Sequence, residues 1–213
     1  MPQDEYKQHR HHGPGAGSTA EVREFFTPRA AGWDSRFPDD GPAYVAAVAE
    51  LGPRTGDAVL DAGCGTGRAL PALRAAVGPR GTVLGADLTP AMLEAAVHAG
   101  RDGAAVLILG DVTRLPLRDN SLDAVFAAGL ISHLGEPGPG LRELARVVRP
   151  GGRLALFHPV GRAALAARHG RHLTPGDLRD EPNLRPLLAR SGWHLESYTD
   201  EDTRFLALSV RQD

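Results

Sequence analysis

The stretch AVLDAGCGTGR (58–68) decides how this chain folds. Its first half has the length and apolar character of a buried strand, and three alternate glycines, Gly63, Gly65 and Gly67, follow. Glycines directly after the first strand of a parallel sheet let the backbone turn sharply and approach a ligand, beside the free N–H groups of a helix N-terminus. The stretch therefore predicts a strand, a ligand-binding turn and a helix.

Short apolar segments alternate with helical patterns on both sides of this stretch. Strands that are apolar along most of their length and alternate with helices indicate a parallel sheet covered on both faces. Strands are expected at 58–63, 82–87, 104–111, 122–128 and 153–158, and helices at 42–51, 68–77, 90–99, around 141–148 and around 181–190.

The end of the chain follows another pattern. WHLESYT (193–199) and RFLALSV (204–210) are expected strands, and only residues 200–203 separate them. A connection that short permits an antiparallel hairpin and no helical crossover. The predicted sheet therefore ends in an antiparallel pair.

Composition limits the kinds of protein that this chain can be. Its 213 residues suit one domain, expected at 21–213 after a polar, Gly/Pro-rich tail (1–20) that we expect to be disordered. No apolar run reaches the roughly 18 residues of a membrane span, and the N-terminus lacks the apolar core of a secretory signal. Cys64 alone forms no intramolecular disulfide. We expect a cytoplasmic protein without a membrane partner.

Arginine is unusually frequent. Lys7 is the only lysine, so the other 23 of the 24 basic residues are arginines. With 26 acidic residues the formal net charge is −2, which leaves no basic field to attract a nucleic acid. The bias indicates a GC-rich bacterial genome. We expect the arginines on solvated helix faces, away from the ligand except for Arg68 and Arg114, and His169 and His172 likewise in solvent.

Acidic residues end the first three predicted strands. Asp61 lies two residues before the first glycine, where it suits a ligand with an ammonium group and would repel a pyrophosphate. Asp87 can accept both hydroxyls of a ribose, and Asp111 can accept from an exocyclic amine of adenine. The three positions match one ligand with an amino-acid head, a ribose and an adenine.

A nicotinamide-dependent oxidoreductase is the alternative for a glycine-rich turn. Its fingerprint is Gly-x-Gly-x-x-Gly or Ala, in which the third glycine allows close packing of helix and strand. Here Arg68 occupies the third position and the pattern is Gly-x-Gly-x-Gly. Together with Asp61, this disfavours a dinucleotide.

Residues 25–211 resemble the class I S-adenosylmethionine-dependent methyltransferases, in particular the small bacterial UbiE-like group. The resemblance rests on VLDAGCGTGR, VLGADLTPAML, GDVTRLPLRDNSLDAVFAAGLISHL and LRELARVVRPGGRLALF. It implies an α/β fold: a Rossmann-like three-layer sandwich around a seven-stranded, mostly parallel sheet of order 3-2-1-4-5-7-6, with strand 7 antiparallel. It also implies S-adenosyl-L-methionine as cofactor.

The resemblance assigns roles to individual residues. Asp61, Gly63 and Gly65 would surround the methionine end of the cofactor, and Ala128 would offer its backbone to the amino acid. Trp33 lies where relatives often have a Tyr-Asp pair that closes over the cofactor. The ribose and the base would contact Asp87, Leu88, Asp111 and Val112.

Two histidines are candidate catalytic bases, His133 after the fourth strand and His158 at the end of the fifth. An imidazole near its ordinary pKa suits proton transfer at neutral pH, although a base is needed only if the acceptor loses a proton. The alternatives are that His133 only shapes its loop and that His158 is packed. Tyr44 is expected to pack its helix, and no metal site is expected.

The acceptor is expected to be a small metabolite, methylated at O, N or C. Strand four ends without the Asn/Asp-Pro-Pro-aromatic motif of enzymes that methylate exocyclic amines of DNA bases. Residues 159–179 are too few for a large lid domain, so the acceptor pocket would use residues 21–45 and this stretch, or a second copy in a homodimer. The alternative function is a protein that binds the cofactor without methyl transfer, in regulation or assembly.

Overall fold

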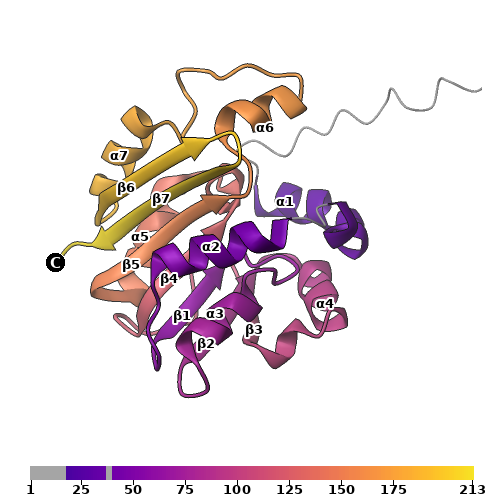
Figure 1. Cartoon of the computed structure of the whole chain (residues 1–213), viewed down its shortest axis with the longest axis vertical. Coiled ribbons are helices and arrows are strands. Elements are labelled where there is room, and N and C mark those ends of the chain that lie inside the picture. Colours follow the sequence, from indigo (N-terminus) through magenta and orange to yellow (C-terminus); the bar gives the residue numbers. More distant parts are fainter. Residues whose placement is uncertain (1–17, 37–39) are drawn as a thin grey trace, which may run out of the picture.

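The computed structural model describes residues 18–36 and 40–213 (Figure 1). The first helix, α1 (Thr19–Phe26), begins inside the segment predicted as a tail. Ser18 caps it, because its hydroxyl accepts from the Glu21 backbone N–H while the Glu21 carboxylate accepts from the Ser18 N–H. The prediction for residues 1–17 falls outside the described residues.

Seven strands form one sheet of order β3-β2-β1-β4-β5-β7-β6, in which β7 runs antiparallel to both neighbours. The predicted fold class, strand order and terminal hairpin are confirmed. The strands are β1 (Ala58–Ala62), β2 (Thr82–Asp87), β3 (Val106–Leu109), β4 (Leu122–Ala128), β5 (Val148–His158), β6 (Trp193–Glu201) and β7 (Arg204–Arg211).

Five α-helices match predicted ones, and their bounds shift by a few residues. The helix predicted from residue 68 begins at 70, because positive φ angles at the glycines extend the preceding loop. These helices are α2 (Gly41–Leu51), α3 (Leu70–Val77), α4 (Pro90–His98), α5 (Pro137–Val147) and α7 (Glu181–Arg190). Helix α6 (Arg162–Arg168) was not predicted, nor were the short 3-10 helices η1 (Thr27–Gly32), η2 (Asp34–Arg36), η4 (Arg101–Gly103) and η5 (Leu130–His133).

Successive strand residues enter two separate cores, one on each face of the sheet. Leu60 packs with α5 and α7, whereas its neighbour Val59 packs with α2 and α3. The same alternation continues along β4 and β5, because neighbouring side chains of a strand point to opposite faces. Two cores around one sheet make the three-layer sandwich, and Figure 1 shows α2 crossing one face.

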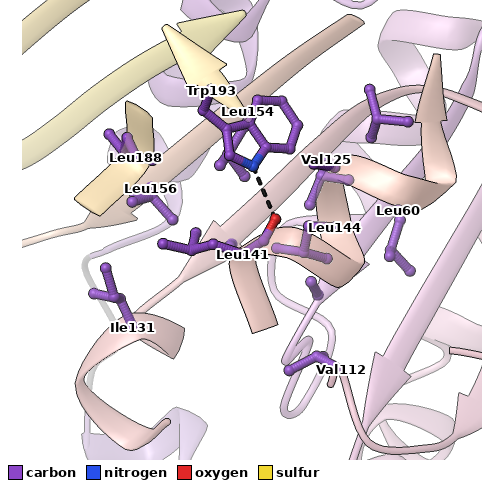
Figure 2. Close-up of a cluster of buried hydrophobic side chains, with 14 of the residues drawn as sticks. Leu60, Val112, Val125, Ile131, Leu141, Leu144, Leu154, Leu156, Leu188 and Trp193 are labelled. Carbon is purple, nitrogen blue, oxygen red and sulfur yellow. Dashed lines mark hydrogen bonds between the residues drawn. The ribbon is translucent and has the colours of Figure 1, made fainter. Parts of the chain in front are cut away.

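Trp193, the first residue of β6, is a buried member of the core that contains α5 and α7 (Figure 2). Its indole is fully buried and Nε1–H donates to the Leu141 carbonyl oxygen at 2.9 Å. A buried indole N–H needs such an acceptor, since an unmade hydrogen bond there costs about 1–3 kcal/mol. This contact joins the terminal hairpin to the middle of α5.

The carboxyl ends of the parallel strands meet at one edge of the sheet. Helices α1 and α6 both lie beyond this edge in Figure 1. Ligands of open parallel sheets bind at this edge, so it is the place to look for a site. Among the described residues, no helix has the length and apolar character needed to cross a membrane.

Candidate active site

A large cavity of about 1140 Å³ opens at the carboxyl edge of the sheet. Pockets for one small ligand commonly measure about 300–1,000 Å³, so this cavity has room for a cofactor and a second molecule. All eleven residues predicted from the sequence line it, and their individual roles stay predictions. They are Trp33, Asp61, Gly63, Gly65, Asp87, Leu88, Asp111, Val112, Ala128, His133 and His158.

The glycine turn leaves space at its centre. Gly63 and Gly65 have φ angles of 68° and 55°, which side chains rarely adopt. A Cβ atom on Gly65 would meet nothing within 4 Å, whereas one on Gly63 would lie 2.9 Å from a Leu130 methyl group. Gly65 therefore borders open cavity, and Gly63 is required by both its φ angle and the close approach of η5.

Asp61, at the end of β1, is buried, and among the described residues no cation forms an ion pair with it. It is 2% exposed, and its Oδ1 has no hydrogen-bond partner among the described residues. Burial, followed by the nearby charge of Asp87, raises the pKa of this carboxyl from 3.8 to about 8. An orphaned carboxylate oxygen that borders a cavity fits a ligand with an ammonium group.

Asp87, at the end of β2, has a structural role that the sequence did not reveal. Its Oδ2 accepts the Gly65 N–H at 2.8 Å, and its Oδ1 accepts the Thr89 N–H at 2.8 Å. Burial raises its pKa, and these hydrogen bonds oppose that rise. Each oxygen keeps a further lone pair, so the carboxylate can hold the glycine turn and still accept a ligand hydroxyl.

Asp111 follows β3 and lies at the same edge. Its Oδ1 accepts both the backbone N–H and the hydroxyl of Thr113, each at 2.8 Å. These contacts fix the turn that presents the Asp111–Val112 pair to the cavity, where Val112 is 6% exposed. The apolar side chain beside the carboxylate suits a planar base.

The N-terminal segment, defined here as residues 18–36, lines the cavity beside the cofactor residues. Trp33 and Phe26 pack edge to face at 5.5 Å, and Phe26 packs in the same way on His133 at 5.0 Å. Arg23 Nε–H donates to the Leu88 carbonyl oxygen at 3.0 Å. The segment thus contacts both predicted ends of the site.

His158 is a neutral imidazole in this environment. Its Nδ1 lies 2.8 Å from the Val160 carbonyl oxygen and 3.1 Å from the Val160 nitrogen. Burial lowers the pKa of this side chain from 6.5 to about 4, and the charges of Arg179, His133 and Arg168 add to the effect. The expectation of a near-ordinary pKa is therefore wrong for His158.

Tyr44 combines packing with a position at the cavity. Its ring lies 5.1 Å from that of Phe157, and the Arg68 guanidinium lies 5.3 Å from the Tyr44 ring centroid. Burial raises the pKa of the phenol, which stays protonated at neutral pH. The predicted packing role is confirmed, and Tyr44 also lines the cavity.

The expectation that arginines avoid the ligand edge is wrong. Seven arginines line the cavity, and Arg114 is not among them. His169 and His172 line it too, although both are exposed as predicted. The seven are Arg29, Arg36, Arg68, Arg162, Arg168, Arg171 and Arg179. Four come from residues 159–179. No local sequence pattern predicts that this segment lines the cavity.

Within the described part of the chain, no group of three or more His, Cys, Asp or Glu side chains is arranged to hold a metal ion. The polar groups that do converge belong to the carboxyl edge of β1, β2 and β3 and to the segment after β5. The polar side chains that line the cavity are mainly carboxylates, arginines and histidines.

The central part of the chain is similar in sequence to known proteins. Residues 60–156 match the family model described as a methyltransferase domain. The chain is 38% identical over 106 residues to a demethylmenaquinone methyltransferase of Corynebacterium kroppenstedtii, covering 50% of this chain and 43% of that protein. It is 38% identical over 107 residues to the 27-O-demethylrifamycin SV methyltransferase of Amycolatopsis mediterranei, covering 48% and 39%. The matches span less than half of either relative.

Solved structures share the whole fold. The [4+2]-cyclase SpnF superposes with a TM-score of 0.72 over 94% of this chain and 99% of that one, at 19% sequence identity. At that identity the likeness concerns the fold alone. It extends over the N-terminal and C-terminal parts of the chain that the family model does not reach.

Proposed function

We propose that this chain is a class I S-adenosylmethionine-dependent methyltransferase that transfers a methyl group to an O, N or C atom of a small molecule. S-adenosyl-L-methionine is the cofactor of that class. The two relatives described above are named for small-molecule acceptors, which supports an acceptor of this size here. The cytoplasmic location, the absence of a nucleic-acid partner and a monomeric or homodimeric state stay predictions from the sequence.

One observation carries the proposal: three carboxylates at the ends of three neighbouring strands border one cavity. Asp61, Asp87 and Asp111 line it together with the glycine turn. The orphaned Oδ1 of Asp61 fits the ammonium of the cofactor's amino acid, and the open space at Gly65 fits its approach to the backbone. The residues present therefore fit the cofactor.

The chain's own residues would bind the cofactor, orient the acceptor and exclude water. Asp61, Gly63, Gly65 and Ala128 would hold the methionine end, while the ribose and base would contact Asp87, Leu88, Asp111 and Val112. The aromatic side chains that pack around Trp33 would keep water from the reacting atoms. When bound, S-adenosylmethionine supplies a methyl group activated by its sulfonium charge. Alignment of the acceptor then carries much of the rate.

His158 would act on acceptors that lose a proton. In the tautomer that donates Nδ1–H to the Val160 carbonyl oxygen, the shorter of the two Nδ1 contacts, the lone pair lies on Nε2. Neutral Nε2 can accept the acceptor's proton, although the low pKa makes it a weak base. His133 lies close enough to shift the pKa of His158, and we retain it as the second candidate.

The test has two parts on the full chain. Calorimetric titration with S-adenosylhomocysteine should show binding at a 1:1 ratio. Incubation of a host-cell metabolite extract with the chain and methyl-labelled S-adenosylmethionine should give a labelled product that boiled protein does not give. Absence of cofactor binding would overturn the proposal.

The second candidate function is cofactor binding without methyl transfer. Fold alone does not fix a reaction, and the structural neighbour SpnF is named as a cyclase. Binding of S-adenosylhomocysteine with no labelled product from any extract would favour this alternative. Comparing the metabolites of a deletion strain with those of its parent would then separate a regulatory role from a missed acceptor.

A further inference from the structure

We propose that the acceptor carries an anionic group, a carboxylate or a phosphate, which binds to an arginine cluster formed by Arg168, Arg171 and Arg179. The inference rests on the proposed function, whose acceptor class it specifies. The three arginines belong to the segment between β5 and α7, line the cavity, and are not among the residues predicted to bind the cofactor.

Residues 159–179 bring positive charge to the cavity. They contribute four lining arginines and a single lining carboxylate, Asp177. Elsewhere the lining is more balanced, because Arg29, Arg36 and Arg68 line the cavity together with Asp40, Asp61, Asp87, Asp111 and Glu136. The excess of positive charge in residues 159–179 therefore suits a ligand with an anionic group.

Arg162 is not available to a ligand, because carboxylates of the protein already neutralise it. Its guanidinium lies 2.8 Å from Asp200, 2.7 Å from Asp180 and 3.5 Å from Asp177. With 9% side-chain exposure it is a structural ion pair that fixes the start of α6 to β6. The positive charge of this segment is therefore that of the other three arginines.

Arg179 has an unmet donor in the cavity wall. Its Nε is buried and has no hydrogen-bond partner among the described residues. The nearest carboxylate oxygen, Asp177 Oδ1, lies 3.5 Å away and already accepts the Arg179 backbone N–H at 2.9 Å. A buried guanidinium N–H without an acceptor costs free energy, which an anionic oxygen of a ligand would recover.

Arg168 and Arg171 are exposed at the rim and have no carboxylate partner among the described residues. Arg171 Nη2 lies 3.1 Å from His169 Nδ1, which orients the guanidinium without neutralising its charge. Some arginines elsewhere are paired: Arg146 lies 2.7 Å from Glu143, and Arg149 lies 2.7 Å from Asp123. Arg168 and Arg171 thus add positive charge at the cavity that no carboxylate of the described residues offsets.

Apolar side chains line the same cavity. They include Val160 and Leu165 of the segment that carries the arginines, and Leu134 and Phe26. A guanidinium matches the two oxygens of a carboxylate or phosphate with parallel hydrogen bonds. The ligand that fits is a molecule with an apolar body and one anionic group.

The experiment compares matched anionic and neutral probes by ligand-observed NMR titration of the full chain, with and without saturating S-adenosylhomocysteine. The pairs are benzoate with benzamide and phenyl phosphate with phenol. The variants are Arg168→Gln, Arg179→Gln and the control Arg190→Gln. Arg190 is the last residue of α7 as Arg168 is of α6, and it is exposed outside the cavity lining.

We expect at least one anion to bind about tenfold more tightly than its neutral partner and to lose about tenfold in affinity in Arg168→Gln or Arg179→Gln, with Arg190→Gln unchanged. Preference between the two anions identifies carboxylate or phosphate. Equal binding of neutral partners, no binding of either anion, or an equal loss in Arg190→Gln would overturn the inference. Failure of S-adenosylhomocysteine to bind overturns the proposed function instead, since the titrations without it still report anion preference.

Discussion

The hydroxyl of Thr66 donates a hydrogen bond to Asp34 Oδ1 at 2.7 Å, joining the glycine turn to the N-terminal segment. Arg101 reinforces the link, because its Nη1 lies 2.7 Å from both Asp34 Oδ2 and the Thr66 carbonyl oxygen. In contrast, the helical turns of residues 19–36 bury only one residue fully, Ala30. The segment beside the predicted cofactor site is therefore joined to the glycine turn by polar contacts rather than by a buried core.

Replacing Asp34 by Ala should loosen this segment without unfolding the domain. We expect faster amide hydrogen exchange in residues 19–36, an S-adenosylhomocysteine affinity lower by about three- to tenfold, and a nearly unchanged melting temperature. Exchange measured by mass spectrometry and calorimetry check this. The control is Asp119→Ala, which removes another Asp–Arg pair on the exposed α5 side. Unchanged exchange in Asp34→Ala would contradict the assignment.

Replacing Asp87 by Ala should weaken S-adenosylhomocysteine binding at least tenfold. The variant loses the proposed acceptor for the ribose hydroxyls and also leaves the backbone N–H groups of Gly65 and Thr89 without their partner. Calorimetry measures the loss. Asp102→Ala serves as control, since Asp102 is an exposed acid of η4 outside the cavity lining. An affinity equal to that of the unaltered chain would remove Asp87 from the site.

Local patterns predicted the sheet and the acidic edge well. Strands β1 to β4 and the second half of β5 are short apolar runs, and the glycine turn is a single short stretch, so both depend on neighbours in sequence. Because parallel strands share one carboxyl edge, the convergence of Asp61, Asp87 and Asp111 followed from the strands alone. The four-residue connection before β7 likewise required an antiparallel pair.

Features that depend on tertiary contacts were missed. Helix α1 has a readable capping box at Ser18 and Glu21, but it is only eight residues long and buries none of them fully, so it was not recognised. The arginines after β5 reach the cavity only because the chain folds back over the carboxyl edge. The low pKa of His158 arises from burial and from the charges of Arg179 and Arg168. Both arginines lie ten or more residues after His158, so the sequence around the histidine does not indicate them.

Cofactor affinity should rise with pH because Asp61 must ionise to pair with an ammonium. Its folded pKa of about 8 lies above the ordinary 3.8, so the folded chain holds a proton that the unfolded chain loses. Stability without ligand should therefore fall as pH rises from about 4 to 8, while S-adenosylhomocysteine affinity rises up to about tenfold per pH unit below 8. Calorimetry at pH 6.0, 7.0 and 8.0 measures the slope.

The matched variant for this pH effect is Asp61→Asn, which keeps the shape of the side chain and cannot ionise. We expect it to bind S-adenosylhomocysteine weakly, with the pH slope lost. Titrations in two buffers of different ionisation enthalpy should also detect proton release by the unaltered chain below pH 8. An affinity of the unaltered chain that is flat between pH 6.0 and 8.0 would exclude the Asp61–ammonium pair.

His158→Gln should lower methyl transfer while leaving S-adenosylhomocysteine affinity within about twofold. The extract assay with labelled cofactor reports transfer, and calorimetry reports binding. Because the pKa of His158 falls from 6.5 to about 4 on folding, the unfolded chain takes up a proton at pH 5 that the folded chain does not. Stability contributed by this side chain is thus full above pH 6.5 and is lost as pH falls toward 4.

The two readouts separate a catalytic imidazole from a packed one. A smaller fall in melting temperature between pH 7 and pH 5 in His158→Gln than in the unaltered chain would establish the buried neutral histidine, whatever its role. Reduced labelling at pH 7, where the variant is folded and binds cofactor, would then assign proton transfer to Nε2. His133→Gln is the companion variant, since its ring borders the same cavity. Full labelling by His158→Gln would leave packing as the role of His158.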